Sequence, residues 1–189
     1  MHPAVILRIF GLLLMIYSGT LLVPVLVAAL YGEGDMLRFL YSFLATLLCG
    51  LLCWLPVQNR RRELRVRDGF IIVTLFWSVL SLFGALPYLL GQELQLEFTD
   101  ALFESVSGFT TTGATVLTGL DQLPKSLLYY RHQQQWLGGL GIIVLAVAIL
   151  PMLGVGGMQM YRAETPGAVK DSKLTPRVTE TARSLWYIY

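Results

Sequence analysis

Residues Glu104–Thr115 read ESVSGFTTTGAT and lie between two long apolar segments of the chain. Three consecutive threonines and a glycine carry main-chain and hydroxyl groups that need hydrogen-bond partners or a ligand. The use of these polar groups decides which fold and which function the rest of the sequence supports.

Composition places the chain in a membrane. Of its 189 residues, 55% are hydrophobic and 14% are charged, whereas charged residues make up about 25% of a soluble domain. A helix that crosses the hydrocarbon core needs about 20 largely apolar residues. Such runs predict an all-α integral membrane protein with four membrane spans: Ala4 to Tyr31, Met36 to Val57, Gly69 to Leu90 and Leu127 to Val155.

The apolar runs at the two ends of the chain need separate interpretation. The first follows Arg8 and ends in small residues, but it is much longer than the about 7–15 residues of a signal-peptide core. We therefore expect it to remain as a membrane helix. A last apolar stretch begins at Ser184 and is too short to cross a membrane. We accordingly expect the chain to be the N-terminal portion of a longer protein.

Basic residues gather in two loops and predict the orientation of the chain. One group lies between the second and third spans and the other follows the fourth: Arg60, Arg61, Arg62, Arg65, Arg67, Arg162, Lys170, Lys173, Arg177 and Arg183. Positive residues favour the cytoplasmic side, so both loops and the N-terminus are predicted to be cytoplasmic. Membrane lipid is the expected partner of these loops, and nucleic acid is not.

The connections on the opposite, outer side are acidic. Their acidic residues are Glu33, Asp35, Glu93, Glu97, Asp100, Glu104 and Asp121. Negative charge beside a pore raises the local concentration of cations. We therefore expect the outer side to attract cations toward the segment that contains ESVSGFTTTGAT.

A short helix is predicted at FTDALFESVSGF, residues 98–109, with Thr99 or Asp100 as its N-cap and Gly108 near its end. About ten residues rise only ~15 Å, half a bilayer, so this helix can enter the membrane but cannot cross it. Irregular backbone at membrane depth is tolerated only where protein buries it or where it lines a water-filled path. TTTGAT is therefore predicted to line such a path or to coordinate a ligand.

Cation coordination is the chemistry that these residue types favour. An ion filter needs successive carbonyl oxygens around one axis, with backbone angles that a glycine such as Gly113 adopts without steric cost. Threonine adds a hydroxyl acceptor without charge, and the preceding helix ends in a partial negative charge. A threonine-rich extracellular turn is the alternative, and composition alone leaves it equally open. The position between a half-length helix and a glycine-bearing span favours the pore.

The chain resembles the Trk, Ktr and HKT potassium transporters, and among them the TrkH-type subunits of bacteria. The resemblance rests on LVPVLVAALYG, DGFIIVTLFWSVLSLFGALPY, TDALFESVSGFTTTGAT, QQWLGGLGIIVLAVAILPMLGVGGMQMYRAE and KDSKLTPRVTETARSLWYIY. The family fold has four helix, pore-loop, helix repeats around one pore, with an extra leading helix pair in TrkH-type proteins. The resemblance therefore implies a leading pair at 1–58, a basic cytoplasmic loop at 59–68, a first repeat at 69–161, and a cytoplasmic connection with the start of a second repeat at 162–189.

The resemblance also implies a site and partners. Thr110, Thr111, Thr112 and Gly113 would form a quarter of a selectivity filter and bind the transported potassium ion through main-chain oxygens. In the family, glycine at the position of Gly113 goes with potassium selectivity, and serine goes with sodium permeation. The implied location is the bacterial inner membrane, with uptake by symport or through a channel. A homodimer, a cytoplasmic nucleotide-binding TrkA-like regulatory subunit and no organic cofactor are the remaining implications.

One pore loop supplies only a quarter of a coordination ring. Either the chain is part of a four-repeat protein, which we expect, or four copies would assemble into a homotetrameric cation channel. A structural membrane subunit without transport is a third alternative, although it gives the half-length helix no purpose. Enzyme activity is not expected, because Ser105 and Ser107 lack a Gly-x-Ser-x-Gly elbow and the only histidines are His2 and His132.

Small residues in the fourth span have a structural interpretation. Gly138, Gly139 and Gly141 in WLGGLG are predicted to let this span pack closely against the pore loop. Pro151 is predicted to end the span, since proline cannot continue the hydrogen-bond pattern of a helix. These glycines are therefore expected to act in packing and not as a hinge.

Four further residues are predicted to have no role in ion binding. Cys49 and Cys53 lie one helical turn apart in the second span, where small apolar side chains suit packing, so no disulfide or metal site is expected. Lys125 and Arg131 lie near the outer end of the fourth span. We expect both to extend their charged groups to the membrane surface.

Overall fold

The computed structural model describes residues 3–58, 66–91, 94–144 and 187–189, and these residues contain helices but no β-strand. The predicted all-α class is therefore confirmed for the described residues. Contacts divide the chain into two units, Met1–Gly138 and Gly139–Tyr189. The first unit contains the predicted filter, and its helices are described below.

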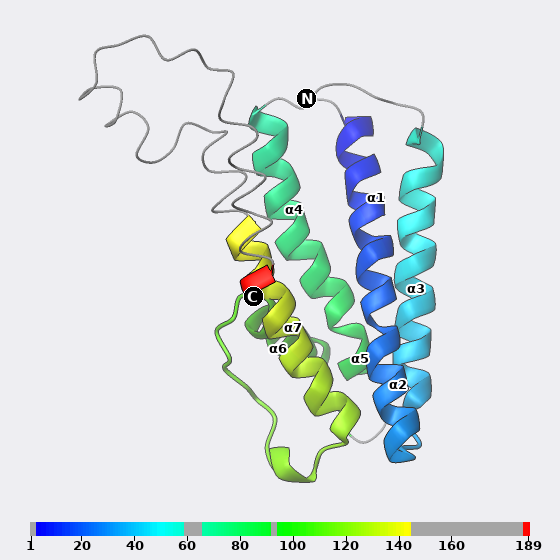
Figure 1. The fold of residues 1–189 in the computed structure, drawn as a ribbon, viewed down its shortest axis with the longest axis vertical. Helices are drawn as coiled ribbons and strands as arrows, with labels where there is room; N and C mark the ends of the chain where they lie inside the picture. Colours follow the sequence, from blue (N-terminus) through cyan, green and yellow to red (C-terminus); the bar gives the residue numbers. More distant parts are fainter. Residues whose placement is uncertain (1–2, 59–65, 92–93, 145–186) are drawn as a thin grey trace, which may run out of the picture. The chain divides into compact units, whose positions relative to one another are not determined.

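The first unit begins with two antiparallel helical segments (Figure 1). The first segment consists of α1 (Pro3–Thr20) and α2 (Leu22–Tyr31), and the second consists of α3 (Met36–Trp54) and the short 3-10 helix η1 (Leu55–Val57). The segments of 29 residues from Pro3 and 22 residues from Met36 are long and apolar enough to cross a membrane. They pack closely, since a Cβ on Gly50 would lie 2.9 Å from the Gly11 carbonyl oxygen. The predicted helix pair is confirmed, and we call residues 3–57 the leading pair.

The first segment is interrupted because a proline removes a main-chain donor. Pro24 has no N–H group to bond to the carbonyl oxygen of Thr20, four residues earlier. The helix breaks at Leu21, between α1 and α2. The predicted first span is therefore two helices, and the Thr20 oxygen is available to a partner outside them.

The third predicted span is interrupted in the same way. It consists of α4 (Val66–Gly84) and α5 (Leu86–Leu89), with Pro87 in the first turn of α5. The N–H group of Tyr88 bonds to Ala85 at 3.1 Å, whereas a continuous helix would direct it to Gly84. The carbonyl oxygen of Gly84 is thereby free to accept hydrogen bonds from other helices.

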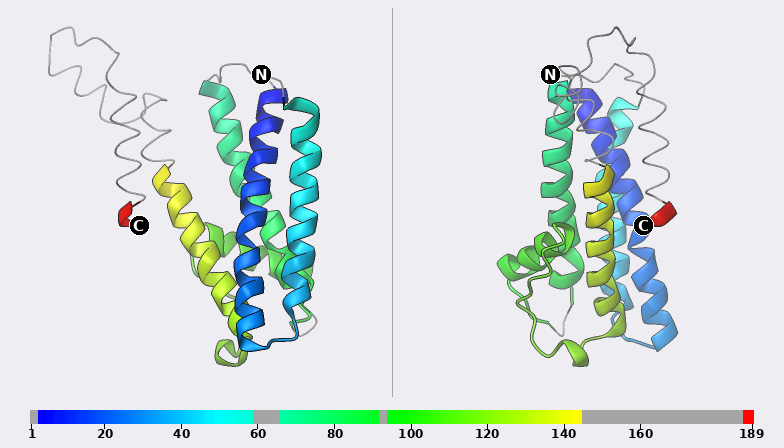
Figure 2. Two further views of the ribbon diagram at one scale, coloured as in Figure 1. Left: turned by 45° about the vertical axis from the view of Figure 1, so that its right-hand side comes forward. Right: turned by 60° about the vertical axis from the view of Figure 1, so that its left-hand side comes forward.

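After α5 the chain forms the short helix α6 beside the neighbouring helices and then returns toward the end at which α7 begins (Figure 2). This part consists of α6 (Phe98–Phe109), an extended segment, the 3-10 helix η2 (Leu120–Gln122) and α7 (Lys125–Val144). The last carbonyl of α6, that of Phe109, lies against Gly138. Gly138 is 13 residues into α7, about 20 Å along its axis. Because the chain then returns to η2, just before α7 begins, the predicted re-entrant loop is present.

The start of α6 differs from the prediction. Glu97 is the N-cap residue, with extended backbone and no capping side-chain bond, and its carbonyl oxygen accepts the N–H group of Ala101 at 3.0 Å. The prediction of Thr99 or Asp100 as N-cap is therefore wrong. Asp100 lies in the first helical turn, where its negative charge favours the helix dipole.

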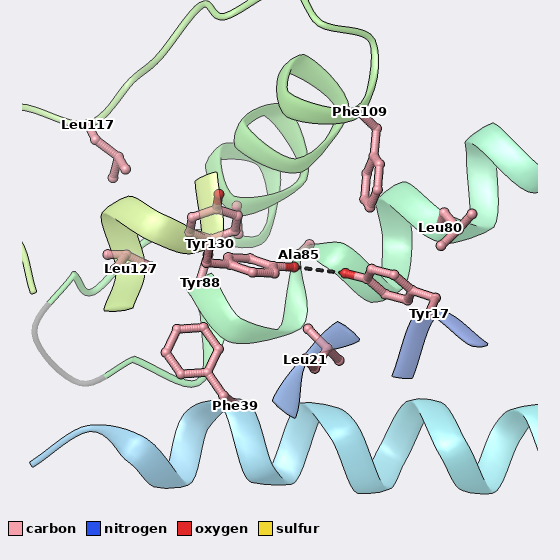
Figure 3. Close-up of a cluster of buried hydrophobic side chains, with 11 residues drawn as sticks. Tyr17, Leu21, Phe39, Leu80, Ala85, Tyr88, Phe109, Leu117, Leu127 and Tyr130 are labelled. Atoms are coloured by element: carbon pink, nitrogen blue, oxygen red, sulfur yellow. Dashed lines mark hydrogen bonds between the residues drawn. The ribbon is translucent and has the colours of Figure 1, made fainter. Parts of the chain in front are cut away.

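A buried aromatic cluster joins the leading pair to α5, α6 and α7 (Figure 3). Tyr17 of α1 meets Phe109 of α6 with ring centroids 5.6 Å apart, and Phe39 of α3 meets Tyr130 of α7 at 5.5 Å. Tyr88 of α5 lies 5.4 Å from Tyr130. All five side chains are at most 4% exposed. The leading pair and helices α5, α6 and α7 therefore share one core.

Several predictions concern residues outside the described ranges. They include most of the arginine-rich loop, Pro151 and the basic segment 162–183. The predicted fourth span is described from Lys125 to Val144. Within the described residues Cys49 and Cys53 are free thiols.

Candidate functional site

The predicted filter residues Thr110–Gly113 follow α6 directly and fold back on its last turn. Their N–H groups donate to α6 carbonyl oxygens over 2.8–3.3 Å: Thr110 to Val106, Thr111 to Gly108, and both Thr112 and Gly113 to Ser107. Within the described residues, the main-chain oxygens of Thr111, Thr112 and Gly113 accept no hydrogen bond. The loop thus directs its donors to the helix and leaves acceptors available for a ligand.

Two residues of this loop have left-handed backbone conformations. Gly113 has φ 74° and Thr111 has φ 58°. Glycine adopts this region freely, but a β-branched residue there is an outlier, and such strain costs about 1–3 kcal/mol. Thr111 is held there by its N–H bond to Gly108 and by its hydroxyl bond to the Thr110 oxygen at 2.7 Å. Strain of this kind is typical of functional loops.

Hydroxyl groups fix the loop at both of its ends. The Thr110 hydroxyl donates to the Val106 oxygen at 2.8 Å and lies 2.8 Å from the Thr112 hydroxyl. Ser107 donates to the main-chain oxygen of Ala114 at 2.6 Å. The two serines of ESVSG are therefore structural, because Ser105 also bonds within the fold, to the amide of Gln134 at 3.2 Å.

Glu104 anchors the extended segment 114–117 that follows the predicted filter loop, here called the returning segment. This side chain is only 2% exposed. Its Oε1 accepts the Thr115 hydroxyl at 2.5 Å and the Val116 N–H at 2.7 Å, while Oε2 accepts Nε of Arg131 at 3.2 Å. One carboxylate thus connects α6, the returning segment and α7. The expectation that Glu104 belongs to the outer cation-attracting charge is wrong, because its charge is buried and paired.

Arg131 does not reach the membrane surface as expected. Its side chain is 12% exposed and forms a salt bridge with Glu104, whose side chain is 1% exposed. A guanidinium beside a buried carboxylate gains more from that partner than from extending along the helix surface. Arg131 therefore supports Glu104, which holds the returning segment.

Two further outer acids are engaged within the fold. Glu33 accepts hydrogen bonds from the first turn of α7, and Asp35 pairs with the buried Arg38. Glu97 and Asp121 are exposed. The predicted attraction of cations by the outer face therefore has fewer contributors than the sequence implies.

The freed carbonyl oxygen of Gly84 is bonded by side chains of α7. The Tyr130 hydroxyl donates to it at 2.8 Å and Nε2 of Gln134 lies 3.2 Å from it. The Tyr88 hydroxyl donates to Oε1 of Gln134 at 2.7 Å. Gly84 has no room for a side chain, since a Cβ would lie 2.6 Å from Cε2 of Phe109. The break in the third span is thus bonded to the helix that follows the filter.

A small crevice lies behind the filter between α5, α6 and α7. Its lining includes Tyr88, Glu104, Ser107, Arg131, Gln134 and Gln135. The Nε2 atom of Gln135 is 3.8 Å from the place that a Cβ on Gly113 would take. The wall behind the filter is therefore polar, whereas Thr110–Val116 are exposed on the other side.

The sequence located the loop but not its support. The sequence alone predicts surface positions for Glu104 and Arg131, and it indicates no role for Gln134 or Tyr88. The signal was YYRHQQQ at residues 129–135, within a predicted membrane span. Polar and charged side chains at such a depth are costly unless they have partners, so this run indicates a bonded interior face.

The close packing predicted for the glycines of WLGGLG is confirmed at Gly138. A Cβ there would overlap the Phe109 carbonyl oxygen and lie 2.7 Å from its carbonyl carbon. The described residues contain no group of three or more histidine, cysteine, aspartate or glutamate side chains that could hold a metal ion.

Comparison with known proteins gives consistent matches. The TrkH family model, described as "Cation transport protein", matches residues 36–189. The Trk system potassium uptake protein TrkH of Vibrio parahaemolyticus is 58% identical over 184 residues, covering 97% of this chain and 38% of that protein. TrkH of Escherichia coli K12 is 54% identical over 189 residues, covering 100% of this chain and 39% of that protein.

The fold also matches a solved structure. The crystal structure of the potassium transporter TrkH from Vibrio parahaemolyticus aligns with a TM-score of 0.84 and 51% identity, covering 100% of this chain and 37% of that one. This chain therefore spans about two fifths of the length of the relatives that it matches.

Proposed function

The chain belongs to the TrkH family of cation transport proteins, and on this basis we propose that it contributes to potassium uptake across the bacterial inner membrane. The observation that carries the proposal is the loop Thr110–Gly113, whose N–H groups are bonded to α6 while three of its main-chain oxygens accept no bond within the described residues. Carbonyl oxygens in this state can replace the water shell of a cation. Potassium is the transported ligand, and no organic cofactor is required.

The site that we propose for potassium consists of the main-chain oxygens of Thr110, Thr111, Thr112 and Gly113. The left-handed backbone at Thr111 and Gly113 supports this assignment, because filter backbones need angles that ordinary residues avoid. Glu104 holds the returning segment beyond the proposed filter. The acceptors thereby stay fixed without a charged side chain at the ion.

A complete pathway requires more filter segments than this loop provides. We propose that 1–58 forms the leading pair, that 59–68 is a cytoplasmic loop, and that 69–161 is the first of four pore-forming repeats. Residues 162–189 would connect to the second repeat. The full assembly would be a homodimer with a nucleotide-binding TrkA-like subunit on its cytoplasmic face, with uptake by symport or through a channel.

Replacing Gly113 with serine in the complete gene product should weaken the preference for potassium over sodium. Space is available, since among the described residues beyond its chain neighbours only Gln135 lies within 4 Å of the new Cβ, at 3.8 Å. The change therefore acts through the backbone, because φ 74° disfavours any L side chain by about 1 kcal/mol. We expect a fall of about fivefold in the potassium-to-sodium uptake ratio, measured with rubidium and sodium tracers.

Gly119 provides a matched control for this substitution. It also has a positive φ, 64°, and its Cβ position is open, so Gly119→Ser imposes a similar backbone cost outside the filter. Selectivity should stay unchanged in this variant. Equal losses of selectivity in Gly113→Ser and Gly119→Ser, or no loss in either, would remove Gly113 from the filter.

The proposed orientation is tested by labelling. Gln95 is exposed in the connection before α6, so a cysteine at this position should react with an impermeant thiol reagent applied to intact cells. A cysteine at Asn59, in the arginine-rich loop, should react only after the cells are opened. The substitutions are made in a background without Cys49 and Cys53, and the reverse labelling pattern would invert the proposed topology.

A further inference from the structure

Helix α7 presents two rows of side chains to two different parts of the fold. Ser126, Tyr130 and Gln133, at spacings i, i+4 and i+7, contact the leading pair. Arg131, Gln134 and Gly138, at i, i+3 and i+7, contact α6. Each row follows one face of the helix. α7 therefore links the leading pair to α6 through two faces of one stiff helix.

The outer contact of the first row is a helix cap supplied from a distant part of the chain. Pro124, just before α7, has no side-chain acceptor for the first N–H groups of the helix. Glu33 supplies it: Oε1 accepts the N–H of Lys125 at 2.5 Å, and Oε2 accepts the N–H and the hydroxyl of Ser126 at 3.2 and 2.5 Å. A carboxylate at a helix N-terminus is favoured by both hydrogen bonding and the helix dipole.

The turn that carries Glu33 is itself fixed. Gly32 ends α2 with φ 67°, and the N–H of Glu33 bonds to the Ala28 oxygen at 2.9 Å. This is the αL ending that stops a helix at a defined residue. The carboxylate is therefore presented to α7 by a rigid turn of the leading pair.

Two deeper contacts complete the row. Nε2 of Gln133 donates to the Thr20 oxygen at 2.8 Å, the oxygen that Pro24 leaves free. The hydroxyl groups of Tyr17 and Tyr130 lie 2.9 Å apart (Figure 3). The leading pair thus contacts α7 at its first turn and at the level of the break between α1 and α2.

We propose that the leading pair positions the filter through α7, and that Glu33 is the positioning residue of this connection. The proposal rests on the potassium function proposed above but adds a determinant outside the pore loop. Glu33 fixes the outer end of α7. Arg131 bonds to Glu104, which holds the returning segment, and Gly138 packs against the end of α6, so that α7 supports both sides of Thr110–Gly113. Loss of the cap should therefore change ion selectivity although Glu33 does not contact the ion.

The test compares Glu33→Ala with Asp121→Asn in the complete gene product. Both substitutions remove one negative charge from the outer side, but Asp121 is exposed, and its side chain forms no hydrogen bond or salt bridge with α7 in the described part of the chain. We expect Glu33→Ala to raise the KM for potassium and to lower the potassium-to-sodium ratio about threefold to tenfold, as loss of one capping group implies. Asp121→Asn removes the same charge without removing a helix cap, so it should leave the potassium-to-sodium ratio unchanged and raise the KM for potassium less than Glu33→Ala does. Ser126→Ala, which keeps the two capped N–H groups, should give a smaller effect.

Amide hydrogen exchange provides a readout that does not depend on transport. Exchange at residues 110–117 should be faster in Glu33→Ala than in Asp121→Asn. Unchanged exchange together with unchanged KM and selectivity would overturn the proposal, as would a loss confined to protein amount and maximal rate. Failure of the potassium function itself would appear separately, as absence of selective uptake by the unmodified protein.

Discussion

Replacing Gly138 with alanine is expected to lower potassium uptake by the complete gene product sharply. The added Cβ would overlap the Phe109 carbonyl oxygen and lie 3.0 Å from the Phe109 Cα. Overpacking costs about 1–3 kcal/mol where side chains can yield. Here the obstacle is the backbone at the end of α6. This helix, the proposed pore helix, must therefore move and carry Thr110–Gly113 with it. We expect uptake to fall by more than about tenfold and the melting temperature in detergent to fall as well.

A helical glycine elsewhere separates this clash from the general effect of the substitution. Gly19 lies in α1 and has nothing within 4 Å of its Cβ position. Gly19→Ala should leave uptake unchanged and add about 0.5–1 kcal/mol of stability, since alanine restricts the unfolded chain more than glycine does. Uptake by Gly138→Ala equal to that of Gly19→Ala would contradict the contact between α7 and the pore helix.

Local properties of the sequence were sufficient to predict the helices and the loop. The apolar runs predicted the leading pair, and the length of residues 98–109 predicted a helix that enters without crossing. The breaks at Leu21 and Ala85 were missed, although Pro24 and Pro87 were visible in the sequence. Hydropathy averages over a window do not register a single missing donor, whereas the hydrogen-bond pattern of a helix depends on it.

The support of the candidate site could not be predicted because its partners are distant in sequence. Glu104 bonds to residues 11–27 positions away, and Glu33 caps a helix that begins 92 positions later. A single sequence gives the charge of these residues but not the neighbours that fix it. Arg131 and Glu104 were therefore interpreted as surface residues. Polar residues within a membrane span indicate that partners exist, but only the fold identifies them.

The largest loss of stability is expected when either Glu104 or Arg131 is changed alone. Removing one member of a buried ion pair leaves the other charge without a partner and costs about 3–5 kcal/mol. Glu104→Ala additionally leaves the Thr115 hydroxyl and the Val116 N–H without their acceptor. Arg131→Met retains these bonds but leaves the carboxylate uncompensated. Both variants should show lower thermal stability and little potassium uptake.

The double variant Glu104→Gln with Arg131→Met distinguishes pairing from bulk. The glutamine oxygen can still accept from Thr115 and Val116, and methionine fills the volume of the arginine stem without a charge. Because no uncompensated charge remains, the double variant should be more stable than either Glu104→Ala or Arg131→Met. A cycle completed with Glu104→Gln alone, measured by thermal unfolding in detergent, gives the coupling energy. If the losses of stability in the two single variants add up to the loss in the double variant, the ion pair contributes no coupling energy. The returning segment would then be held by the hydrogen bonds of Glu104 alone.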